Sequence, residues 1–129
     1  MIVDTSALVA ILRREPEAAH YLQLIQRANR IRVSAATFVE LFIVIERQAD
    51  PEAARQCEIF LQRAGITIEP LTLDQAHIAR QAFHDFGKGR HPAGLNFGDC
   101  FAYALARFTG EPLLFKGEDF RKTDVTPAL

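Results

Sequence analysis

Four acidic residues stand where a carboxylate can do chemistry, and each comes from a separate segment of the chain. They are Asp4 after Met-Ile-Val, Glu40 inside an apolar run, Asp99 after Asn-Phe-Gly and Asp119 shortly after Leu-Leu-Phe. If they converge, their mutual repulsion prevents all of them from ionising unless a cation lies between them. Oxygen ligands, without thiolates or imidazoles at zinc spacing, select a hard ion such as Mg²⁺ or Mn²⁺. Such an ion activates water and neutralises charge on a phosphodiester under attack, which is nuclease chemistry.

Each acid also has an ordinary structural explanation. Asp4 stands where a strand passes into a helix, a common N-cap position. Asp99, in the first turn of a helix, interacts favourably with the helix dipole. Glu40 could form an ion pair with Arg47 or face a window of solvent. Gly98, however, allows a close approach that an ordinary helix cap does not require.

Positive charge and glycine occur together in one stretch, from Gly87 to Gly94. The stretch has no apolar period, so we expect an exposed, mobile loop. Its Lys88 and Arg90, together with Lys116 after a later strand, are the expected contacts to the phosphates of a nucleic acid. A solvated connector explains the same charges. The net charge of −1 gives no overall attraction to a polyanion, so any such contact must be local.

Other catalytic chemistries lack the residues that they need. Serine occurs only at Ser6 and Ser34, and there is no Gly-x-Ser-x-Gly motif for a nucleophile elbow. The four histidines show no pair at the spacing of metal ligands, and three of them are expected on exposed helix faces. The Gly87–Gly89 stretch lacks the strand and the Lys-Ser/Thr pair of a P-loop. The sequence therefore supports neither a zinc hydrolase nor a nucleoside triphosphatase.

The elements that must position the acids alternate between short strands and helices. We expect strands at 1–3, 31–33, 66–68 and 113–115, with a further short edge strand at 124–126. Helices are expected to begin at Asp4 or Ser6, at the Glu15–Glu17 turn, at Ser34 or Thr37, at Asp50, at Thr72 and near Asp99. This alternation predicts a parallel sheet, and ligands of such sheets bind beyond the carboxyl ends of the strands. The helix from 34–37 to about 48 is apolar nearly all round, so a partner subunit is expected to cover one side.

Length and composition predict one α/β domain. A chain of 129 residues with 49% hydrophobic content can bury a core without disulfides or structural metal. Cys57 and Cys100 lie in apolar helical patterns and are expected to be free thiols in a reducing cytoplasm. No signal sequence or bilayer-spanning run is recognisable, so we expect a cytoplasmic protein without a membrane contact.

Taken together, these segments resemble the PIN-domain ribonucleases, and in particular the VapC toxins of prokaryotic toxin–antitoxin pairs. The resemblance covers essentially the whole chain. It rests on Met-Ile-Val-Asp-Thr-Ser-Ala-Leu, the Glu40 helix, Leu-Asn-Phe-Gly-Asp-Cys-Phe-Ala-Tyr-Ala and Leu-Leu-Phe-Lys-Gly-Glu-Asp-Phe. It implies a single PIN-like α/β/α domain over residues 1–129, with a small, mainly parallel sheet flanked by helices. It also implies Mg²⁺- or Mn²⁺-dependent endonucleolytic cleavage of RNA, which inhibits translation or growth.

The resemblance also implies roles for individual residues. Asp4 and Asp99 match the metal ligands of the family, Glu40 matches its third acid, and Thr5 or Ser6 matches a supporting hydroxyl. Family members often carry a threonine and an aspartate directly after the last strand, where Phe115 and Gly117 stand here. The role of fourth acid therefore passes to Asp119 or Glu118.

The implied partners are an RNA substrate, a second copy of the chain and a VapB-like antitoxin that covers the acidic groove. Two alternatives belong to other functional classes. One is a non-catalytic binding module of the same fold, which metal-dependent RNA cleavage would exclude. The other is a receiver-like signalling domain, which needs a phospho-acceptor Asp after a middle strand, whereas 66–71 holds only Glu69.

Overall fold

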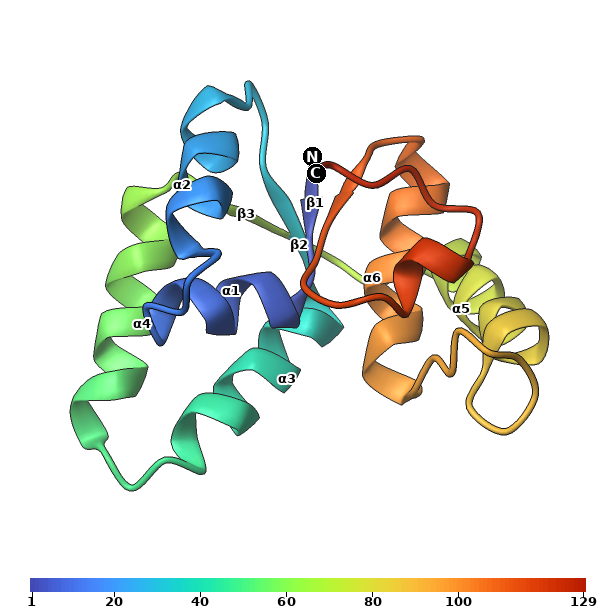
Figure 1. Ribbon diagram of the computed structural model, residues 1–129, viewed down its shortest axis with the longest axis horizontal. Helices are drawn as coiled ribbons and strands as arrows, with labels where there is room; N and C mark the ends of the chain where they lie inside the picture. The colour runs from blue at the N-terminus through green and yellow to red at the C-terminus, as the bar shows by residue number, and fades with distance from the viewer.

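Four short parallel strands form the sheet at the centre of the molecule (Figure 1). The computed structural model describes all residues from Met1 to Leu129. The order in the sheet is β3-β2-β1-β4, so the first strand is central, as its position and apolar sequence predict. The strands are β1 (Ile2–Val3), β2 (Arg32–Ser34), β3 (Thr67–Glu69) and β4 (Leu113–Leu114).

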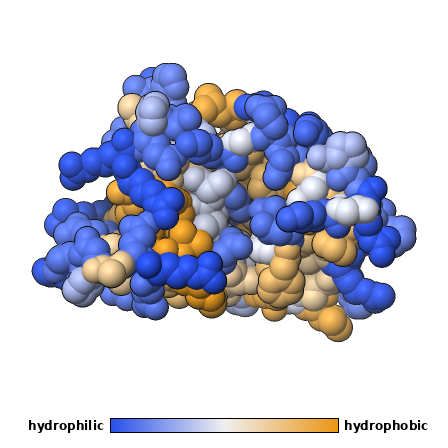
Figure 2. All heavy atoms as spheres, turned by 60° about the horizontal axis from the view of Figure 1, so that its bottom comes forward, coloured by the Kyte–Doolittle hydropathy of each residue, from blue (hydrophilic) through white to orange (hydrophobic).

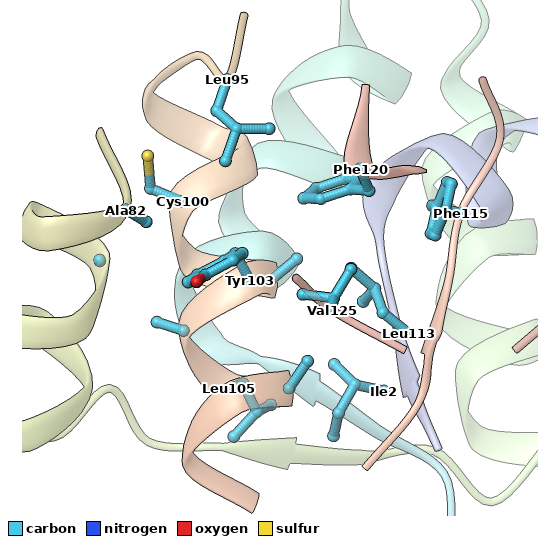
Figure 3. Packing of buried hydrophobic residues seen from close by; sticks show 14 of the residues in the cluster. Ile2, Ala82, Leu95, Cys100, Tyr103, Leu105, Leu113, Phe115, Phe120 and Val125 are labelled. Carbon is cyan, nitrogen blue, oxygen red and sulfur yellow. The ribbon is translucent and has the colours of Figure 1, made fainter. Parts of the chain in front are cut away.

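Helices cover both faces of the sheet, which gives three layers. Ile2 and Leu113 point toward the face covered by α5 and α6, and their cluster includes Tyr103 and Leu105 of α6 (Figure 3). The alternate strand residues, such as Val3, point to the opposite face and pack against the other helices. The helices are α1 (Thr5–Leu12), α2 (Ala18–Arg27), α3 (Ala35–Glu46), α4 (Pro51–Arg63), α5 (Leu73–Phe86) and α6 (Phe97–Thr109). The prediction of an α/β/α fold with a small parallel sheet is confirmed.

Side-chain caps fix where most helices begin. The oxygens of five capping side chains accept backbone N–H groups that the first helical turn leaves without partners. These residues are Asp4, Ser34, Asp50, Thr72 and Asn96. Among the α-helices only α2 lacks a side-chain cap, and it begins at Ala18, directly after the Glu15–Glu17 turn.

One expectation about the loops is wrong. Residues 124–126 form no edge strand: a 3₁₀ helix (η1, Phe120–Lys122) precedes them, and Pro127 pairs with Leu113 only as an isolated bridge. The 87–94 segment is exposed at Lys88 and Arg90, as expected, and backbone hydrogen bonds join its two ends. Lys88 N–H donates to Leu95 O and Leu95 N–H to Phe86 O, both at 2.9 Å. The next helix therefore starts from a fixed position.

The chain itself covers only one side of helix α3. Leu41 and Ile45 are buried, whereas Val39 and Ile43 on another face are 55% and 48% exposed. Both cysteines are free and buried, as expected. No helix has the length and apolar content that crossing a membrane would require.

Candidate active site

Asp4 lies at the carboxyl end of the central strand, where β1 passes into α1. Its Oδ2 accepts hydrogen bonds from the backbone N–H of Ser6 at 3.0 Å and from Ser6 Oγ at 2.6 Å. The residue is only 3% exposed, and its buried Oδ1 has no hydrogen-bond partner. Burial raises the pKa of Asp4 to about 6, with the charge of Glu40 adding to the rise and the Ser6 bonds opposing it. One oxygen of a buried carboxylate is thus left for a ligand.

Ser6 links Asp4 to the neighbouring strand β4. The backbone N–H of Lys116, just beyond β4, donates to Ser6 Oγ at 3.0 Å, and the same hydroxyl donates to Asp4. The two strands whose ends meet here are therefore joined through one side chain. Ser6 fixes the orientation of the Asp4 carboxylate.

Glu40 reaches the same end of the sheet from the middle of α3. Its Oε1 accepts from Thr5 Oγ1 at 2.6 Å, and no ion pair joins it to Arg47. Its carboxylate also fills the space beside Gly98, where a Cβ would collide with both oxygens. The close approach expected at Gly98 is confirmed, and the group that approaches is a carboxylate. The ion-pair explanation of Glu40 is wrong.

Asp99 has two functions in the structure. It occupies the third position of α6, where its Oδ2 accepts from Asn96 N–H at 3.0 Å while Asn96 Oδ1 accepts from Asp99 N–H at 2.9 Å. Burial raises the pKa of Asp99 to about 7, and the charges of Asp4, Glu40 and Asp119 add to the rise. The expected position of Asp99 in the first turn of a helix is confirmed, whereas its role as a metal ligand stays a prediction.

The two candidates for the fourth acid differ in their surroundings. Both follow the turn at Gly117, which has φ +98°. Asp119 is exposed, but its charge acts on Asp99. Glu118 is exposed and lies 3.8 Å from Arg121, with which it pairs. Both candidates are exposed, and which of them serves as the fourth acid stays a prediction.

The three predicted phosphate contacts are not equivalent. The ammonium group of Lys116 pairs with Glu15 and, at 3.4 Å, with Glu17. A phosphate would have to compete with two carboxylates there. Lys88 and Arg90 are exposed and form no ion pair with an acid.

Two contributions were not predicted from the sequence. The cap residue Asn96 could have been found, because Asn-x-x-Asp has the spacing of a capping box. The bond from Lys116 N–H to Ser6 could not, because it joins residues 110 positions apart.

The acids leave one buried carboxylate oxygen without a partner, but they do not form a metal centre. Asp4 Oδ1 has no partner, and no cation is among the groups that perturb the pKa of Asp4 or Asp99. No three His, Cys, Asp or Glu side chains lie where they could hold a metal ion together. The assignment of the four acids as metal ligands therefore stays a prediction.

Comparison with known proteins shows the family to which the chain belongs. The family model described as the PIN domain matches residues 1–125. The chain belongs to the PIN domain family. Ribonuclease VapC28 of Mycobacterium tuberculosis is 51% identical over 130 residues, which cover 100% of this chain and 98% of that protein. The receiver-like alternative is therefore wrong, and Glu69 of β3 instead pairs with Arg30 and Arg32.

Solved structures of low sequence identity share the PIN fold of this chain. The crystal structure of VapC20 from M. tuberculosis, described as a Sarcin-Ricin loop cleaving toxin, has a TM-score of 0.77 at 18% identity. The match covers 97% of this chain and 95% of that one. VapBC2 from Rickettsia felis, bound to a DNA fragment from its promoter, has a TM-score of 0.75 at 17% identity, with 98% and 95% covered.

Proposed function

We propose that this PIN domain protein is a Mg²⁺- or Mn²⁺-dependent endoribonuclease, the toxin of a toxin–antitoxin pair, which inhibits translation or growth by cleaving RNA. The observation that carries the proposal is the buried Asp4 carboxylate at the carboxyl end of the central strand, which keeps one oxygen without a partner. The ribonuclease names of relatives that match the chain over its full length support the substrate class.

Each acid has a role set by its surroundings. Asp4 and Asp99 are the principal ligands, with Glu40 as the third acid and the exposed Asp119 at the rim as the fourth. A Mg²⁺ or Mn²⁺ ion held there supplies a bound water of lowered pKa and neutralises charge on the phosphate. Ser6 and Thr5 orient the carboxylates of Asp4 and Glu40 through bonds of 2.6 Å. These hydroxyls act on the chemistry only through the acids that they hold.

Phosphates of the RNA contact cations outside the acidic cluster. Lys88 and Arg90 are available because no acid neutralises them, and their anchored loop leads directly into α6. Lys116 is a weaker contact, because Glu15 and Glu17 already bind its ammonium group.

Two protein partners belong to the proposal. One is a VapB-like antitoxin that covers the acidic groove. The other is a second copy of the chain, which would cover the exposed Val39 and Ile43 of α3. Helix α3 and the start of α6, at the bottom of Figure 1, come forward in Figure 2, where apolar areas flank a less hydrophobic band. A partner covering both areas would lie directly beside the acidic cluster.

Metal dependence of RNA cleavage tests the proposal. The purified protein is treated with EDTA, and its cleavage of total ribosomal RNA is followed on denaturing gels with and without added Mn²⁺. We expect cleavage only after Mn²⁺ is restored. Cleavage that persists in excess EDTA would contradict the metal site. A folded protein that stays inactive with Mn²⁺ on every RNA offered would favour the non-catalytic binding module.

A further inference from the structure

A groove with a strongly basic lining lies outside the acidic cluster, on the outer side of α5. Three of its residues, His77, Arg80 and His84, come from α5, and Arg90 comes from the loop between α5 and α6. Residues three or four positions apart share one face of a helix, so the three α5 side chains form a single row. Arg90 extends that row from the loop.

The arginines of this groove are not neutralised within the protein. Arg80 and Arg90 are exposed and form no ion pair with an acid. The one acid bonded to groove residues is Asp85, which accepts from Gln81 at 3.0 Å and contacts His84 at 3.2 Å. Asp85 itself lines a different hollow, beside Tyr103 and Arg107. The groove therefore keeps an uncompensated positive charge in a protein whose net charge is −1.

The groove adjoins a second, apolar hollow that reaches the first residue of α6. Arg80 and Phe83 also line a neighbouring apolar hollow between α5 and α6, whose lining includes Phe97. Phe97 is the first residue of α6 and stands two positions before Asp99. Arg80 thus lines both hollows, whereas Arg90 lines only the basic groove.

We propose that the groove formed by His77, Arg80, His84 and Arg90 binds the phosphate backbone of the RNA substrate, at nucleotides flanking the cleaved bond. The proposal rests on the ribonuclease function proposed above and adds a substrate-binding site to it. The planar guanidinium of arginine binds phosphate in a two-pronged manner, and such contacts act on any sequence. The groove therefore contributes affinity, while the acids perform the cleavage.

A binding experiment separates these two contributions. Asp4→Asn, which keeps the capping side chain but loses the charge, is used as a cleavage-deficient background. The affinity of this variant for a fluorescein-labelled RNA stem-loop is measured over a range of salt concentrations. The same measurement is made after adding Arg80→Ala/Arg90→Ala, which gives the groove variant. The matched control is Arg27→Ala/Arg63→Ala, which removes two exposed helical arginines from α2 and α4.

We expect the groove variant to weaken RNA binding on the order of tenfold at low salt, because two phosphate contacts are lost. Each lost contact also lowers the salt slope, which is the slope of the logarithm of the binding constant against the logarithm of the salt concentration, by roughly 0.7. The slope should therefore fall by about 1.4 in the groove variant and stay unchanged in the control. In the active protein, the groove variant should raise KM and leave single-turnover cleavage at saturating RNA unchanged.

Other outcomes would overturn the inference. An affinity and salt slope equal to those of the control would show that RNA does not contact the groove. Unchanged RNA binding with weakened binding of the antitoxin would assign the groove to a protein partner. Failure of the proposed function is recognised separately, because the unmodified protein would then cleave no RNA in the presence of Mn²⁺.

Discussion

The carboxylate of Glu40 occupies the space that a side chain at position 98 would need. Helices α3 and α6 thereby approach each other closely where Glu40 of α3 lies against Gly98 of α6. The bond from Thr5 Oγ1 holds the same carboxylate from the other side. Glycine is thus needed at position 98 because of the Glu40 carboxylate. The helix alone would accept a residue with a side chain there.

Gly98→Ala tests this relationship. The added methyl group would push the Glu40 carboxylate out of place, so we expect cleavage to fall by roughly tenfold or more, as for the loss of a positioning contact. Stability should change by less than about 1 kcal/mol, because the displaced atoms end a flexible side chain and alanine favours the helix. Single-turnover cleavage and urea unfolding measure the two effects. Gly110→Ala, at φ +71° after α6, should show the reverse pattern of lost stability and retained cleavage.

Ser6→Ala is expected to weaken metal binding without unfolding the protein. The change removes the hydroxyl that donates to Asp4 and accepts from Lys116 N–H. Loss of a group that orients a ligand typically lowers metal affinity roughly 10- to 100-fold. Calorimetric titration with Mn²⁺ measures this loss of metal affinity. Ser34→Ala serves as the control, because it removes the α3 cap and should lower stability by about 1 kcal/mol with Mn²⁺ affinity unchanged.

Mn²⁺ is expected to raise the melting temperature of the protein. A ligand at a hundred times its dissociation constant stabilises the folded state by about 2.7 kcal/mol. Asp4→Asn should abolish this rise. It should also make the metal-free protein more stable than the unmodified one at neutral pH, because it removes a desolvated charge and keeps a good cap. A variant that melts earlier than the unmodified protein in EDTA would show that the Asp4 charge is compensated.

Introducing charge on α3 is expected to break a homodimer. Val39→Lys/Ile43→Lys would place two ammonium groups on the proposed contact, so light scattering during size-exclusion chromatography should report a monomer in place of a dimer. Leu73→Lys, at a residue 73% exposed on α5, is the control and should leave the mass unchanged. A dimer that persists in the α3 variant would place the interface elsewhere.

Much of the arrangement could be predicted because it depends on local patterns. The apolar triplet before Asp4 predicts a buried central strand, and the order of capping residues and apolar stripes predicts the helices. The position of Asp4 follows from the rule that ligands of parallel sheets bind beyond the carboxyl ends of the strands, whereas Glu40 and Asp99 lie on helices, to which this rule does not apply.

What could not be predicted depends on contacts between distant residues. The ion pairs of Lys116 with Glu15 and Glu17 bridge about a hundred positions, and nothing near Lys116 in the sequence indicates them. The row of His77, Arg80 and His84 looked like an ordinary solvated helix face. Only the position of Arg90 beside that row makes it a groove.

The central claim is that Asp4 and Asp99 bind a divalent ion that enables RNA cleavage. It is tested most directly by single-turnover RNA cleavage with Mn²⁺, comparing Asp4→Asn and Asp99→Asn with the unmodified protein, after circular dichroism shows that all three are folded. We predict that each variant loses cleavage by at least about 100-fold, since each removes a charged ligand of the catalytic ion. Cleavage at the unmodified rate by either folded variant would contradict the account.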